Sequence, residues 1–174
     1  MSKSLGSRLP PEVLEMLAGK DLRASSGLTF TLVVSDAAGW PSFALLSVGE
    51  VLAVDETTVR LALWPGSGTT AALTASGKAT MMVIGGDSVW YLHLAARRGP
   101  DLDAPGMHRA YFECAVDEVL VDKVTYARIT SGISFELPDP DAVLGRWQET
   151  IDLVRSAPPV PAAVESAAAA SSAG

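Results

Sequence analysis

The chain has 174 residues, 48% of them hydrophobic, and its formal net charge at pH 7 is -7. This length and apolar content predict a single domain with a buried core. The acidic balance argues against nucleic acid as a partner, because phosphate backbones are bound by clustered Lys and Arg, and the one adjacent basic pair is Arg97-Arg98.

Cysteine content and hydropathy indicate where the protein works. No run of about 18 apolar residues is present, so we expect neither a membrane span nor a membrane partner. Residues 1–8 are polar and lack the apolar centre of a secretory signal. The single cysteine, Cys114, cannot form an internal disulfide, which predicts a reducing, cytoplasmic setting. Cys114 lies in an apolar alternation, which indicates a buried side chain rather than a nucleophile.

The first predicted elements are a short helix and a hairpin. Residues 9–19 place apolar side chains on a helical stripe that begins with prolines and stops at Gly19. Residues 28–35 alternate apolar and polar side chains, and residues 41–54 return as the second strand of a hairpin. Gly49-Glu50 lies within this return strand and predicts a bulge or bend.

Residues 58–77 predict a strand, a tight turn and a short helix. Residues 58–64 alternate with the two-residue period of a strand, and Pro65-Gly66 marks the turn. Ser67 is a suitable N-cap for the helix that follows, and Gly77 suits the left-handed residue at its end.

The start of this helix is a candidate anion site. Unsatisfied N–H donors and the positive end of the helix dipole coincide at a helix N-terminus. The hydroxyls of Ser67, Thr69 and Thr70 lie beside it, so the phosphate of a nucleotide-like cofactor is the expected ligand. The alternative is that Ser67 only caps the helix and that the threonines only face water.

The second half of the chain continues with strands. Residues 79–84 and 88–96 predict a second hairpin, and residues 98–107 predict a loop. Residues 108–121 resume the strand pattern, with a loss of phase near Asp117 that predicts a bend or an end.

The C-terminal part is predicted to be a helix and a tail. Residues 139–155 form the clearest helix, with Asp139 as the cap and Pro140 at the first helical position. Residues 156–174 are rich in Ala, Pro and Ser, cannot build a core and are predicted to be disordered. The chain thus divides into a domain over residues 1–155 and a tail.

Strands linked by short hairpins, with a few helices at edges and ends, predict a mainly β fold with peripheral helices. A closed or split antiparallel β-barrel suits this order. An immunoglobulin-like sandwich suits it less well, because one helix is inserted between two strands.

This order of elements resembles that of the pyridoxamine 5′-phosphate oxidase-like family, the FMN-binding split β-barrels, over residues 9–155. The similar part is a strand, a Ser-containing turn and a short helix that ends in Leu73-x-x-x-Gly77. The resemblance implies a homodimer that holds FMN, or in some branches a deazaflavin, at the subunit interface. Other members are associated with haem. It also implies that the turn and helix at residues 67–73 lie at the cofactor phosphate, and that the isoalloxazine is bordered by Leu61, Ala62, Leu63 and Trp64.

The chain departs from the family pattern at the phosphate site. Members often have Ser-x-Lys-x-x-Asn-Leu in the turn, whereas this spacing gives Ser67, Thr69, Ala72 and Leu73 here. The Arg that members carry on the long strand has no counterpart in residues 41–44. A phosphate is normally bound through charge-assisted hydrogen bonds. Hydroxyls and N–H groups alone would hold a phosphate more weakly. The basic side chains that could compensate are Arg60, or Arg97 and Arg98 from a partner subunit.

Other groups of polar residues give weaker evidence for a functional site. The histidines, His93 and His108, have no second ligand at metal spacing, so we expect no metal site, and haem ligation through either one is an open alternative. Asp101 and Asp103 lack the remaining ligands of a calcium loop and are interpreted as solvated carboxylates.

Two functional hypotheses follow. In the first, the protein is a flavin-dependent oxidoreductase of a small-molecule substrate, in which FMN carries the chemistry and the protein binds and orients it, with no catalytic side chain identified. In the second, the protein is a split-barrel binding or structural module without redox chemistry, or a haem-binding relative.

Overall fold

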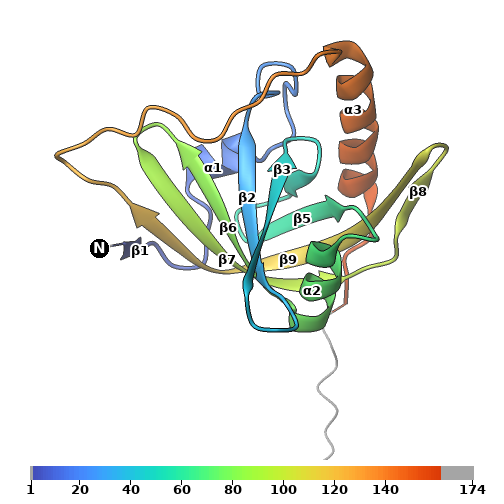
Figure 1. Cartoon of the computed structure of the whole chain (residues 1–174), viewed down its shortest axis with the longest axis horizontal. Helices are drawn as coiled ribbons and strands as arrows, with labels where there is room; N and C mark the ends of the chain where they lie inside the picture. The colour runs from blue at the N-terminus through green and yellow to red at the C-terminus, as the bar shows by residue number, and fades with distance from the viewer. Residues whose placement is uncertain (1, 162–174) are drawn as a thin grey trace, which may run out of the picture.

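The computed structural model describes residues 2–161. Within them the chain builds one 9-stranded sheet with helices around it (Figure 1). In chain order the elements are β1 (Lys3–Ser4), α1 (Pro11–Met16), β2 (Thr29–Ser35), β3 (Pro41–Ser47), β4 (Val51–Ala53), β5 (Thr58–Leu63), α2 (Gly68–Ser76), β6 (Lys78–Gly85), β7 (Ser88–Arg98), β8 (Leu102–Ala104), β9 (Met107–Asp122) and α3 (Pro140–Ser156).

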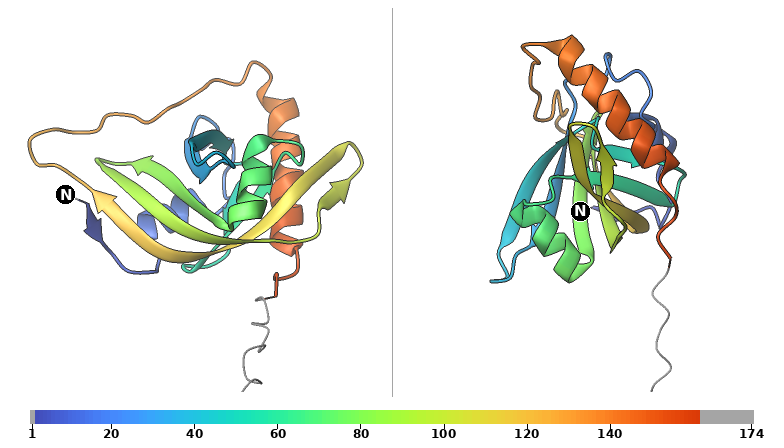
Figure 2. Two further views of the ribbon diagram at one scale, coloured as in Figure 1. Left: turned by 60° about the horizontal axis from the view of Figure 1, so that its bottom comes forward. Right: turned by 90° about the vertical axis from the view of Figure 1, so that its right-hand side faces the viewer.

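The strands pair in the order β3-β2-β6-β7-β9-β5-β4, and β1 and β8 also pair with β9. Every pairing is antiparallel. The sheet curls into a half-barrel, as the two views of Figure 2 show. The predicted mainly β fold with peripheral helices is confirmed.

The predicted loss of phase near Asp117 is a β-bulge. On β7, His93 pairs with Glu118 and the next residue, Leu94, pairs with Val116, so Asp117 on β9 has no partner on β7. An extra residue of this kind increases the local twist and bends the strand, which helps the sheet to curl.

The predicted bend at Gly49-Glu50 separates β3 from β4. The Glu50 carboxylate accepts hydrogen bonds from the backbone N–H and the hydroxyl of Ser47, both at 2.8 Å. The Glu50 carbonyl accepts a hydrogen bond from Ala62 N at 2.9 Å, so the bend between β3 and β4 is hydrogen-bonded to β5.

The prediction of a loop over residues 98–107 is wrong. β7 continues to Arg98, and β8 pairs with the start of β9, from Leu102 opposite Arg109 to Ala104 opposite Met107. Gly106 adopts a φ of 77°, so it closes a hairpin turn. Because β8 is only three residues long, its sequence gives no alternation strong enough to predict a strand.

Helix α3 is confirmed with its predicted cap and buried stripe. The Asp139 side chain accepts a hydrogen bond from Ala142 N at 3.3 Å. Ile151 and Val154 are fully buried, and the helix packs on β4 and β5.

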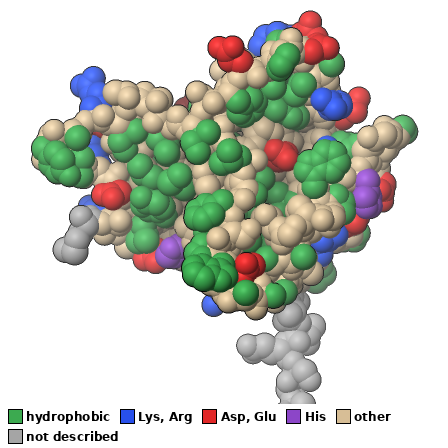
Figure 3. All heavy atoms as spheres, in the orientation of Figure 1, with side chains coloured by type: hydrophobic (Ala, Val, Ile, Leu, Met, Phe, Trp, Pro, Cys, Tyr) green, Lys and Arg blue, Asp and Glu red, His purple; other side chains and the backbone are tan. Residues whose placement is uncertain are grey.

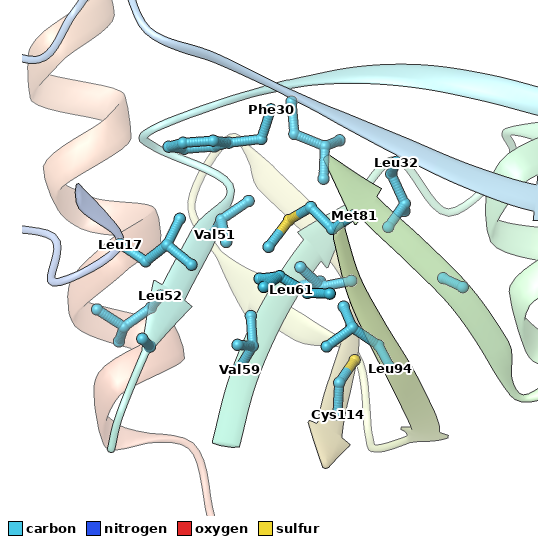
Figure 4. Close-up of a cluster of buried hydrophobic side chains, with 14 of the residues drawn as sticks. Leu17, Phe30, Leu32, Val51, Leu52, Val59, Leu61, Met81, Leu94 and Cys114 are labelled. Carbon is cyan, nitrogen blue, oxygen red and sulfur yellow. The ribbon is translucent and has the colours of Figure 1, made fainter. Parts of the chain in front are cut away.

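The core fills the inside of the curled sheet. Alternate residues of the strands point into it together with side chains from the segment after α1 (Figure 4). Labelled members are Leu17, Phe30, Leu32, Val51, Leu52, Val59, Leu61, Met81, Leu94 and Cys114.

The predicted tail begins within the described residues. Ala157, Pro158 and Val160 make hydrogen bonds to side chains of β5 and β9, so these three belong to the packed body rather than to a disordered segment. The rest of the predicted tail, from residue 162 on, lies outside the described residues. Among residues 2–161, none of the helices has the length and apolar character needed to cross a membrane.

Candidate functional site

Helix α2 has the caps that the sequence predicts. Ser67 is the N-cap, and its hydroxyl oxygen accepts a hydrogen bond from Thr70 N at 3.1 Å. Gly77 ends the helix in the left-handed conformation, with a φ of 64°, and its N–H donates to the Leu73 carbonyl at 2.9 Å.

The hydroxyls at this turn bond to one another. Ser67 Oγ lies 3.0 Å from Thr70 Oγ1, and Thr70 Oγ1 donates to the Trp64 carbonyl at 2.7 Å. Thr69 and Thr70 are buried. Within residues 2–161, the N–H groups of Gly68 and Thr69 have no protein acceptor, and they are the donors that the helix start offers to an anion. That Ser67, Thr69 and Thr70 bind a phosphate stays a prediction.

Of the residues predicted to border a ring system, only Trp64 is accessible. Leu61, Ala62 and Leu63 are at most 3% exposed because they belong to the core, whereas Trp64 is 62% exposed. Trp64 follows the last residue of β5, directly before the turn. A ring bound in this conformation would meet the Trp64 side chain but not the other three side chains.

Arg109 supplies a positive charge at this turn. Its guanidinium lies 4.0 Å from the centroid of the Trp64 ring, a cation–π contact. Its Nη1 donates to the His108 carbonyl at 2.9 Å, and its Nε is buried without a partner among the described residues. The predictions from sequence considered Arg60, Arg97 and Arg98 but missed Arg109. The strand register is the observation that identifies Arg109. Leu63 pairs with Ala110, and this pairing places Arg109, the preceding residue of β9, beside Trp64.

An open surface hollow with a volume of about 610 Å³ is lined by residues of this turn and of the β8–β9 hairpin. Small-molecule sites commonly measure roughly 300–1,000 Å³. The hollow is lined by Trp64, Pro65, Gly66, Asp103, Ala104, Gly106, Met107, His108 and Arg109.

Arg60 cannot replace the missing phosphate ligand, because it is buried and fully engaged. Its Nε and Nη2 donate to Glu113 Oε2 at 3.1 and 2.9 Å. Its Nη1 donates to the carbonyls of Val154 and Ala157 at the end of α3, at 3.0 and 2.9 Å. This interpretation of Arg60 is therefore corrected: it is an internal cap for α3.

The charges of Arg97 and Arg98 are also engaged within the chain. Arg97 Nη2 lies 3.6 Å from Glu113 Oε1. Arg98 pairs with Asp101, and its guanidinium lies 5.2 Å from the centroid of the Phe112 ring. A contribution of either residue to a partner subunit stays a prediction.

The two histidines differ in their freedom to bind a ligand. His108 Nδ1 bonds to Asp103, and its Nε2 lies 3.3 Å from Asp101 Oδ2. His93 has Nδ1 at 3.4 Å from Glu118 Oε2, and no bond to its Nε2 is formed within residues 2–161. Over the same residues, no group of three or more His, Cys, Asp or Glu side chains is arranged to hold a metal ion.

Cys114 is a core residue, as predicted. It is fully buried, and burial raises the pKa of its thiol to about 12. Since the thiolate is the reactive form, Cys114 is no nucleophile in the folded chain.

The outer face of the sheet carries a largely apolar row, interrupted by the buried Thr31. Strand register places Leu45, Thr31, Met82, Tyr91 and Leu120 side by side across β3, β2, β6, β7 and β9. Figure 3 shows hydrophobic side chains gathered over the part of the surface formed by β2, β3 and β6. The neighbouring exposed aromatic residues are Trp40 and Phe43, at 72% and 66% exposure.

Comparisons with known proteins give a relative in sequence. The chain is 32% identical over 140 residues to YclD of Bacillus subtilis strain 168, an uncharacterized protein, and the match covers 80% of this chain and 91% of YclD. No protein-family model matches the chain.

Solved structures identify the fold. A protein of Lactobacillus delbrueckii, described as a candidate pyridoxamine 5′-phosphate oxidase, matches with a TM-score of 0.52 and 14% identity, over 67% of this chain and 98% of that chain. HupZ of Group A Streptococcus matches with a TM-score of 0.51 and 12% identity, over 74% and 99%. The fold is therefore the predicted split β-barrel.

Proposed function

This chain belongs to the same family as Bacillus subtilis YclD and has the split-barrel fold, and from the geometry of its site we propose that it binds a flavin nucleotide as a homodimer. FMN or a deazaflavin is the cofactor in this proposal. The reaction is an oxidoreduction of a small molecule.

The contact between Arg109 and Trp64 carries this proposal. The start of α2 offers two free N–H groups but no charged side chain, and Arg109 places a guanidinium at the same turn. In this proposal the phosphate receives backbone hydrogen bonds from the helix start and charge-assisted hydrogen bonds from Arg109. The indole of Trp64 offers an exposed aromatic surface that lines the open hollow beside this turn.

The bound flavin would supply hydride transfer, and the protein would supply binding, orientation and exclusion of water. In this division the N–H groups of Gly68 and Thr69 and the guanidinium of Arg109 hold the phosphate, and Trp64 borders the ring. Asp103 and His108 of the β8–β9 hairpin line the other side of the hollow.

The homodimer is proposed from the outer face of the sheet. Contiguous apolar surface on a sheet is unfavourable in water and is typical of interfaces. The row from Leu45 to Leu120 continues to the exposed Phe43 and Trp40 at the β2–β3 edge. A second copy of this chain, which presents the same row, would cover it with the symmetry of a two-fold dimer.

The test of cofactor binding is a titration of the purified protein with FMN and with a deazaflavin, monitored by fluorescence quenching. We expect quenching with the native chain, and a dissociation constant at least about tenfold higher for Arg109→Ala, since a charge-assisted bond contributes about 1.5–3 kcal/mol. Arg146→Ala, an exposed arginine on α3, is the matched control and should bind like the native chain.

The opposite result would favour a binding or structural module without flavin chemistry. Two observations support that alternative: the hydroxyls of Ser67 and Thr70 bond to each other, and Arg60 caps α3. A protein that gives no quenching with FMN or a deazaflavin would contradict the flavin proposal and leave the turn as a well-capped connection.

A further inference from the structure

The segment after α3 is fastened to a buried cluster of charged and polar side chains. The centre of the cluster is the ion pair of Arg60 on β5 and Glu113 on β9, whose side chains are 8% and 7% exposed. These residues lie directly opposite each other in the two strands. Such a pair loses its hydration on folding and needs further hydrogen bonds to compensate.

Several of these further bonds come from residues 157–160. The Ala157 carbonyl accepts from Arg60 Nη1 at 2.9 Å. The Pro158 carbonyl accepts from the Tyr111 hydroxyl at 3.4 Å, and the Val160 N–H donates to Glu113 Oε1 at 3.1 Å. Backbone groups from one short segment thus satisfy donors and acceptors on both strands.

The same cluster holds the end of α3. Arg60 Nη1 also donates to the carbonyls of Val154 and Arg155, at 3.0 and 3.3 Å, in the last turn of the helix. These carbonyls lie at the negative end of the helix dipole, where a cation is stabilising. The helix and the segment after it therefore share one buried guanidinium.

Close packing around Gly99 indicates that residues 157–160 bind at a defined position on the sheet. A Cβ at Gly99 would lie 2.5 Å from Tyr111 Cδ1 and 3.0 Å from Val160 Cγ2. Gly99 also donates its N–H to the Tyr111 carbonyl at 2.9 Å. The backbone at Gly99, the Tyr111 ring and the Val160 side chain are thus in close mutual contact.

We propose that residues 157–160 are a latch, seated on the Arg60–Glu113 pair, that holds α3 on the half-barrel and fixes the β5–β9 strand pair. The strand pair is the one whose ends carry Trp64 and Arg109. Opening of the latch removes one hydrogen-bond partner each from Arg60, Tyr111 and Glu113, exposes their buried cluster to water and loosens the C-terminal end of α3. The latch makes residues 157–160 part of the domain.

The test compares two shortened chains, one ending at residue 161 and one ending at residue 156. We expect the chain ending at 156 to melt roughly 5–15 °C lower than the chain ending at 161, because it uncovers a buried charge pair. Hydrogen exchange should show loss of amide protection in α3 and in β5 of the shorter chain. Equal melting temperatures with equal protection would overturn the proposal.

A substitution in the full chain covers the case in which the chain ending at 156 fails to fold. Val160→Pro removes the N–H that Glu113 accepts, whereas Val160→Ala keeps it and trims only the side chain. We expect faster exchange in α3 for Val160→Pro than for Val160→Ala, and equal exchange would contradict the latch. None of these readouts needs a bound cofactor, so a failed flavin titration leaves this test unaffected.

Discussion

The role that the sequence suggests for Arg60 differs from the role that the structure shows. In the alternating pattern of residues 58–64 it reads as a polar residue on a strand, available to a ligand. In the fold it is buried between Glu113 and the end of α3. A buried guanidinium of this kind contributes through the partners that it satisfies.

The ion pair gives the first prediction. Arg60→Met leaves the Glu113 carboxylate buried without its main partner, so we expect the free energy of unfolding in urea to fall by about 3–5 kcal/mol. The double variant Arg60→Met with Glu113→Leu removes both charges and should lose less than the sum of the two single variants. A loss below about 1 kcal/mol for Arg60→Met would show that the pair contributes little.

Two buried acids give a prediction for the pH dependence of stability. Burial raises the pKa of Tyr111 from 10.0 to about 12, and that of Cys114 from 9.0 to about 12. Each folded-state pKa is raised, so the stabilisation is fully present below the unfolded-state pKa and is lost as pH rises from there toward the folded-state value.

Unfolding in urea should therefore become easier from pH 9 upward, with a slope of up to about 1.4 kcal/mol per pH unit for each group. Tyr111→Phe should flatten the part between pH 10 and 12, and Cys114→Ala the part that begins at pH 9. A stability that is constant between pH 8 and 11 would contradict the burial of both groups.

At the scale of elements, substitutions at Ser67 can distinguish the capping of α2 from phosphate binding at its N-terminus. Ser67→Ala removes the cap and should lower stability by about 1 kcal/mol. Ser67→Asp keeps a good cap, but its carboxylate would repel a phosphate at the helix start. We expect Ser67→Asp to melt near the native temperature and to bind FMN more weakly, measured by thermal unfolding and by fluorescence quenching. Native affinity in this variant would place the phosphate away from α2.

The β8–β9 hairpin is the element that completes the candidate site. It brings Asp103, His108 and Arg109 to the turn after β5, and its tip is tied to α3 through a contact of 2.9 Å between the Thr150 hydroxyl and Met107 Sδ. The hairpin lies beside α3 in Figure 1. The site therefore depends on two strand ends and on the helix that supports the hairpin.

At the scale of the whole molecule, the outer face of the sheet predicts the oligomeric state. Leu45→Glu places a charge at the β3 end of the apolar row, beside the exposed Phe43, so we expect it to convert the proposed dimer into a monomer, measured by size exclusion with light scattering. Val54→Glu is the matched control, since Val54 is exposed in the turn between β4 and β5. A native chain that already elutes as a monomer would contradict the proposed dimer.

Local patterns were sufficient to predict most elements of this protein. The two-residue alternation predicted β2, β5, β7 and β9, and an apolar run predicted β6. The caps at Ser67, Gly77 and Asp139 predicted two helices. These signals involve only residues near each other in the chain. The order of the elements predicted a closed or split antiparallel barrel, and the family resemblance favoured the split barrel. The short β8 was missed because three residues carry no period.

The tertiary structure alone decided which polar groups are available. Strand register placed Arg109 over Trp64, and it placed Arg60 opposite Glu113, contacts between residues about 50 positions apart. The tertiary structure also shows that Ala157 and Val160 are hydrogen-bonded to the Arg60–Glu113 pair, although the composition of residues 156–174 predicts a disordered tail. Sequence determines local conformation and which side chains prefer burial, whereas the partners of a buried charge depend on pairing between distant strands.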